Sequence, residues 1–143
     1  MRISSRCLIK TTVVLNPLRA ANWELLGTTY STNIPLAQGA DAFAVQSLRQ
    51  AVVLDPINPA LRIALGGIYY GQGDFENAVR VYELAVTTKP DLTNTHYNLA
   101  FAYGGKKDYD NTVQQMTLVL SLVDRTSPDY EVAKKALTEL QNK

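Results

Sequence analysis

The sequence predicts an all-α protein made of repeated pairs of antiparallel helices. When the second half of the chain is shifted by 34 residues it superposes on itself, so that Pro56 falls on Pro90 and Tyr69 falls on Tyr103. Apolar residues recur at the spacing of an amphipathic helix, and glycine, aspartate and proline punctuate the chain at the same interval. A period of this length is typical of a helical solenoid, in which each repeat packs against its neighbours.

The chain is expected to start with an odd helix, followed by a lengthened repeat. Residues 3–16 are expected to form the second helix of a partial preceding repeat, because the Asn16-Pro17 step matches the Asp55-Pro56 step that closes the next unit. Repeat 1 covers residues 20–57 and carries about five residues more than the others. The extra residues fall in the turn between its two helices.

This turn contains both a helix breaker and two large aliphatic side chains. Pro35 disfavours helical geometry in the residue before it, so the first helix of repeat 1 is expected to end by about Asn33. Ile34 and Leu36 stand in an otherwise polar turn. We expect both to be buried in the core of repeat 1, because burial best explains large aliphatic side chains in such a place.

Two repeats of regular length follow, over residues 58–92 and 93–126, and a capping helix over 127–142 ends the chain. Asp74 is placed to cap the second helix of repeat 2, and Asp108 occupies the same place in repeat 3. The helix after Asp74 has one apolar stripe, made of Phe75, Ala78, Tyr82 and Ala85.

The capping helix is amphipathic. Its apolar stripe consists of Tyr130, Ala133, Leu137 and Leu140, and Lys134, Lys135 and Glu139 are assigned to the opposite, polar face. One apolar side and one charged side are what the last helix of an open-ended solenoid needs.

The sequence resembles a known repeat family through the opening motif of each repeat. Trp23-x2-Leu26-Gly27-x2-Tyr30 matches the W-x2-L-G-x2-Y opening of the tetratricopeptide repeat. Gly27, Gly66 and Ala100 share one position of the motif, where a small residue lets a partner helix approach closely. The resemblance covers residues 17–124, and in overall texture the chain also looks like the tetratricopeptide segments of bacterial proteins. It implies a right-handed superhelix of three helix pairs, with the odd helix before them and the capping helix after them.

Composition excludes several classes of partner. The chain has 143 residues, with 14 Lys and Arg against 13 Asp and Glu, so its net charge of +1 provides no basic field for nucleic acid. No stretch approaches the roughly 18 apolar residues of a spanning helix, so we expect no direct membrane insertion. The single cysteine, Cys7, excludes an internal disulfide. The default expectation is a cytoplasmic protein, or the soluble part of a membrane-associated one.

The sequence offers no catalytic or metal site, and no cofactor is expected. His96 is the only histidine, and it falls on the position of Trp23 in repeat 1, so a packing role is favoured over a role as base or ligand. Most carboxylates fall at caps, turns and polar helix faces, where helix-dipole and solubility roles explain them. No phosphate-binding glycine pattern is present. We therefore predict that the protein is not an enzyme.

The resemblance implies a concave groove lined by the first helix of each repeat. The candidate peptide-binding residues on these helices are Ile63, Tyr70, Asn94, Tyr97, Asn98 and Phe101. Asn98 resembles one asparagine of the carboxylate clamp found in chaperone-binding members, but the basic residues that complete the clamp are absent. Binding is therefore expected to use apolar, aromatic and amide contacts, with little dependence on salt.

The predicted function is that of a scaffold or adaptor that binds a peptide or a partner protein. The alternative is a structural or self-associating module with no dedicated peptide ligand, which would meet a second copy through the N-terminal helix or a solenoid end. A small enzyme would need a cluster of polar residues, and the sequence provides none.

Overall fold

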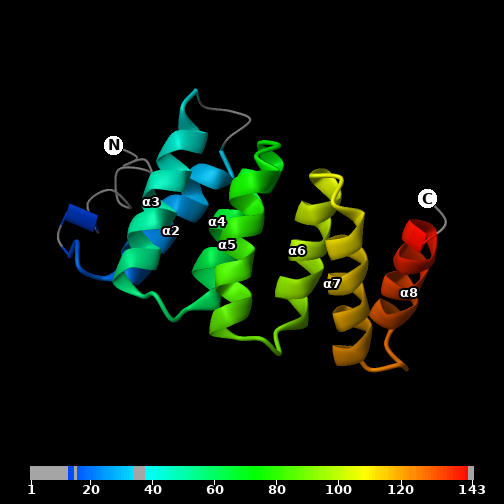
Figure 1. Ribbon diagram of the computed structural model, residues 1–143. Coiled ribbons are helices and arrows are strands. Elements are labelled where there is room, and N and C mark those ends of the chain that lie inside the picture. The colour runs from blue at the N-terminus through cyan, green and yellow to red at the C-terminus, as the bar shows by residue number, and fades with distance from the viewer. Residues whose placement is uncertain (1–12, 15, 34–37, 142–143) are drawn as a thin grey trace. The chain divides into compact units, whose positions relative to one another are not determined.

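The computed structural model describes residues 13–14, 16–33 and 38–141. Within these residues the protein is all helical and has no strand, which confirms the predicted all-α class (Figure 1). The helices are α2 (Ala20–Ser31), α3 (Ala40–Leu54), α4 (Pro59–Gly71), α5 (Phe75–Thr88), α6 (Thr93–Gly105), α7 (Tyr109–Leu122) and α8 (Pro128–Gln141). The chain divides into two compact units, an N-terminal unit up to Ile68 and a C-terminal unit from Tyr69 onward.

Two sequence predictions fall largely outside the described residues. Of the helix expected over residues 3–16, Val13, Val14 and Asn16 are described; Val13 and Val14 are helical, and Asn16 is not. Ile34 and Leu36, expected to be buried, lie outside the described residues. The predicted end of the first helix of repeat 1 is confirmed, because α2 ends at Ser31 and Asn33 already lies in a turn.

In the N-terminal unit, α2 packs closely against α3 at a glycine. A Cβ atom added to Gly27 would come within 2.6 Å of Leu48 Cγ, and Leu48 is 1% exposed. No side chain larger than hydrogen fits here unless Leu48 moves. Beside this contact, Tyr30 and Phe43 stack with their ring centroids 5.2 Å apart. The close helix approach expected at Gly27 is therefore present.

In the C-terminal unit each helix from α5 to α8 packs against the next one along the chain (Figure 1). Ala78, Tyr82 and Ala85 of the predicted α5 stripe are buried. A second core cluster joins α6, α7 and α8 through Ala100, Met116, Val119 and Ala133, and Leu137 packs against it. The apolar stripe of the capping helix therefore faces the protein, as predicted.

The turns between paired helices repeat one backbone conformation at intervals of 34 residues. Gly39, Gly73 and Lys107 have φ values of 75°, 76° and 63°, in the left-handed region. Glycine adopts this region freely, whereas a residue with a side chain is strained there, so Lys107 costs repeat 3 about 1 kcal/mol. The predicted caps follow these turns: Asp74 Oδ1 accepts the Asn77 N–H at 3.2 Å, and Asp108 Oδ1 accepts the Asn111 N–H at 3.3 Å.

A second repeated feature joins the start of each first helix to the proline six residues earlier. Trp23 Nε1 donates to the Pro17 carbonyl at 2.7 Å, an Arg62 guanidinium N–H donates to the Pro56 carbonyl, and His96 Nε2 lies 2.8 Å from the Pro90 carbonyl. These carbonyls can only accept, so His96 carries a proton on Nε2. Three chemically different side chains thus perform the same task. His96 is 4% exposed and its Nδ1 contacts Gln115, so the structure gives it a packing role.

Candidate functional site: a groove along α6 and α8

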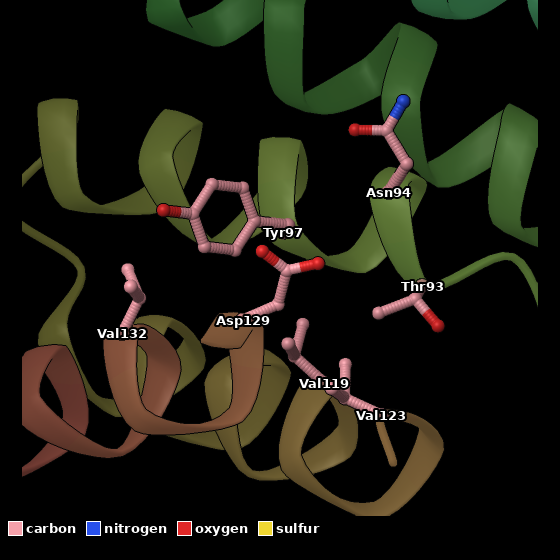
Figure 2. A pocket seen from close by; sticks show the side chains of 7 residues that line it. All are labelled: Thr93, Asn94, Tyr97, Val119, Val123, Asp129 and Val132. Carbon is pink, nitrogen blue, oxygen red and sulfur yellow. The ribbon is translucent and has the colours of Figure 1, made fainter. Parts of the chain in front are cut away.

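In the C-terminal unit, two cavities are lined jointly by α6, α7 and α8. The first has a volume of about 400 Å³ and is lined by Thr93, Asn94, Tyr97, Val119, Val123, Asp129 and Val132 (Figure 2). The second has a volume of about 270 Å³ and is lined by Tyr70, Ala100, Phe101, Gly104, Gly105, Thr112, Met116, Ala136, Glu139 and Leu140. We call the residues that line the two cavities the α6–α8 groove.

Small side chains on the facing helices leave this space open. Ala100 and Gly104 lie on the α6 side and Ala136 lies on the α8 side. The buried side chains of Met116 and Val119 close the groove from α7. The groove therefore combines an apolar base with walls too short to fill it, which is typical of a preformed ligand site.

An aromatic pair on α6 links the two cavities. The rings of Tyr97 and Phe101 meet edge to face with their centroids 4.8 Å apart. Tyr97 lines the first cavity and Phe101, which is 42% exposed, lines the second. Tyr70 contributes a third ring to the second cavity and is held edge-on against Phe75 at 5.4 Å. These contacts fix the rings before any ligand arrives, so little side-chain entropy is lost on binding.

The structure brings together four of the six residues predicted for the site. Tyr70, Asn94, Tyr97 and Phe101 line the groove. Asn98 is absent from the described lining, and its Nδ2 reaches the Asn94 Oδ1 at 3.4 Å, so it can orient that side chain. Ile63 belongs to the N-terminal unit and is not among the described lining residues either.

Sequence reasoning missed the α7 and α8 walls of the groove. Val132 and Asp129 come from the capping helix, and Val119 and Val123 come from the end of α7. Glu139, assigned to the polar face, is exposed and also lines the second cavity, beside Leu140. The amphipathic pattern of the capping helix was the available signal, since its stripe is wide enough to serve both the core and the groove.

Charge in the groove is one-sided. Among the described lining residues Asp129 and Glu139 are charged, and none is lysine or arginine. In Figure 2 the Asp129 carboxylate points from α8 towards α6, where Tyr97 and Asn94 lie. The expectation of little salt dependence rested on the absence of lysine and arginine from the groove and did not include these two carboxylates.

The titratable groups elsewhere serve structure. Tyr103 donates its hydroxyl hydrogen to Glu83 at 2.5 Å, and burial together with this bond raises the Tyr103 pKa well above its usual range. Burial raises the pKa of Tyr82 to about 12. Among the described residues no cluster of His, Cys, Asp or Glu could hold a metal ion. None of the described helices combines the length and the apolar character that crossing a membrane requires.

Comparison with known proteins identifies the repeat. Residues 66–107 match the family model described as TPR repeat. A crystal structure of MamA is 16% identical with a TM-score of 0.80, over 99% of this chain and 85% of that one. The thermophilic TPR protein TTC0263 from Thermus thermophilus is 18% identical with a TM-score of 0.74, over 94% and 70% of the two chains. The first TPR of Spaghetti (RPAP3), bound to HSP90 peptide SRMEEVD, is 19% identical with a TM-score of 0.71, over 87% and 94%.

A comparison with curated protein sequences gives no match. The repeat match and the structural neighbours confirm the predicted tetratricopeptide resemblance. The solved tetratricopeptide repeat proteins share the fold of this chain, and the repeat model matches residues 66–107 of it.

Proposed function

We propose that this chain acts as a scaffold or adaptor that holds a peptide segment of a partner protein in the α6–α8 groove, on the basis of this groove and of the tetratricopeptide repeat match over residues 66–107. The observation that carries this proposal is the Tyr97–Phe101 pair, fixed edge to face with an open cavity at each of its two residues. The peptide-bound structure of Spaghetti shows that the same fold holds a peptide in that protein.

Each part of the groove has a role suited to a peptide. The aromatic pair and Tyr70 provide apolar surface for side chains, and partly exposed rings of this kind are frequent anchors at interfaces. The Asn94 amide offers two donors and an acceptor, which can pair with the backbone of an extended segment. Apolar cavities with a few placed polar groups give both affinity and orientation.

The test uses peptides selected from a random dodecamer library against the full chain. Phe101→Ala is expected to weaken the selected peptides about 5- to 30-fold, the effect of losing an aromatic anchor worth about 1–2 kcal/mol. Tyr109→Ala is the matched control, because Tyr109 is 45% exposed and is not among the described lining residues. Fluorescence anisotropy measures both affinities. Peptides that bind the Phe101 variant as tightly as the wild type would place the binding surface elsewhere.

A further inference from the structure

We infer that the groove selects basic, amphipathic peptides, in which two apolar side chains lie between lysine or arginine residues. This inference rests on the proposed function and adds the chemistry of the ligand. It follows from the charge of the groove, from the position of its carboxylates on α8 and from the spacing of its cavities.

The charge of the groove opposes an acidic ligand. The described lining offers the carboxylates of Asp129 and Glu139 and no cationic side chain to balance them. Lys134 and Lys135 belong to the same helix, but neither is among the described lining residues. The peptide bound by Spaghetti, SRMEEVD, carries three acidic residues. A peptide of that kind would meet like charge here, whereas a basic one gains a favourable interaction near each cavity.

No interaction within the described residues explains why both Asp129 and Glu139 are present in the groove. Neither has a hydrogen-bond or ion-pair partner among the described residues. Asp129 lies in the first turn of α8, where the helix dipole favours a negative charge. Glu139 lies in the last turn, where the dipole opposes one. Glu139 is exposed and forms no ion pair with the described residues, so its carboxylate is accessible to a ligand.

The spacing of these groups fits a short extended segment. Asp129 and Glu139 are ten residues apart on α8, which at about 1.5 Å per residue is roughly 15 Å. An extended peptide covers that distance in about five residues. Tyr97 and Phe101 are separated by about 6 Å along α6, close to the roughly 7 Å between side chains i and i+2 of an extended chain. Two apolar side chains can therefore enter the two cavities while basic residues at the ends face the carboxylates.

The test compares selected peptides on two charge variants of the full chain. In the groove variant Asp129→Asn is combined with Glu139→Gln, which removes both charges and keeps the side-chain shapes. In the control variant Glu131→Gln is combined with Asp110→Asn, two exposed positions absent from the described lining. Circular dichroism melting checks that all three proteins are folded before binding is measured.

The expected result has three parts. Peptides selected on the wild type carry a net positive charge, they bind the groove variant about 3- to 10-fold more weakly than the wild type and the control variant, and their affinity falls as salt rises. Selected peptides that are neutral or acidic, or that bind the groove variant unchanged, would overturn this inference while leaving the proposed function intact. If the library yields no peptide that binds the wild-type chain, the proposed function itself is overturned.

A second copy of the chain is the competing occupant. Light scattering at several concentrations distinguishes it, because a dimer that dissociates on Phe101→Ala would assign the groove to self-association and overturn the inference. The monomer is the expected result in the concentration range used for peptide binding.

Discussion

Two buried threonine hydroxyl groups differ in whether they form a hydrogen bond, and this difference affects stability. Thr95 and Thr112 are both buried threonines of the C-terminal unit. The Thr112 hydroxyl donates to the Asp108 carbonyl at 2.7 Å, whereas the Thr95 hydroxyl has no hydrogen-bond partner among the described residues. A buried hydroxyl without a partner keeps the cost of removal from water and gains nothing in exchange.

The two threonines therefore predict opposite responses to the same substitution. Thr95→Val removes an unsatisfied hydroxyl at nearly constant volume and is expected to raise the free energy of unfolding by about 1 kcal/mol. Thr112→Val removes a hydrogen bond that is made and is expected to lower it by about 1 kcal/mol. Urea denaturation measures both. Destabilisation by Thr95→Val would show that its hydroxyl has a partner.

At the scale of single residues, the sequence predicts those interactions that form between residues close together in the chain. Asp74 and Asp108 were identifiable as caps because a cap acts on a backbone N–H three residues away. The unpaired hydroxyl of Thr95 was not predictable, since it depends on which groups surround it in the folded core. Lys107 was also missed, because glycine normally marks a left-handed turn and lysine gives no such signal.

At the scale of elements, helix pairs are set by their closest contacts. Gly27→Ala is expected to lower the free energy of unfolding by about 1–3 kcal/mol, because the new methyl group would lie within 2.6 Å of Leu48 Cγ. Gly104→Ala is the matched control in another helix, since its Cβ would meet Thr112 Oγ1 at an ordinary 3.8 Å. There the gain in helix propensity should stabilise the protein by about 0.5–1 kcal/mol. Equal effects of the two substitutions in thermal melting would contradict the packing described for α2 and α3.

The cap of α5 predicts a dependence of stability on pH. Hydrogen bonds from the Asn77 side chain and backbone N–H hold the Asp74 pKa below its ordinary value. The carboxylate form therefore stabilises the fold above about pH 4, the unfolded pKa, and this contribution is lost as pH falls through the lower folded pKa. Asp74→Asn keeps a capping oxygen but cannot titrate, so its stability should fall less between pH 5 and pH 2 than that of the wild type. Parallel pH profiles from urea denaturation would contradict this account.

The repeated hydrogen bond to a proline carbonyl shows that the position of a residue in the repeat is easier to predict than the interaction its side chain makes. The 34-residue and 39-residue offsets aligned Trp23, Arg62 and His96 in the sequence, and the structure gives all three the same acceptor. Their side chains share only an N–H donor, so no residue-type pattern indicates the bond. Knowledge of the position in the repeat is what makes it recognisable.

At the scale of the whole molecule, the fold class and the helix order followed from periodicity, whereas the groove did not follow in full. The α6 side was predicted because Asn94, Tyr97 and Phe101 share one helix face in the repeat. The α8 side was not, because the distance between α6 and α8 is a tertiary property that no local pattern encodes. The missing side carries Asp129 and Glu139, and with them the charge that distinguishes this groove.

The most direct test of the central claim is a nuclear magnetic resonance titration of the full chain, labelled with ¹⁵N, with a peptide selected from the library. The largest amide shifts are expected in residues of the α6–α8 groove, among them Ala100, Gly104, Val132 and Ala136. Amides near exposed residues of α3 such as Val53, which is 71% exposed, should not move. Shifts confined to α3 or α5, with the groove amides unchanged, would contradict the proposal that this groove holds the peptide.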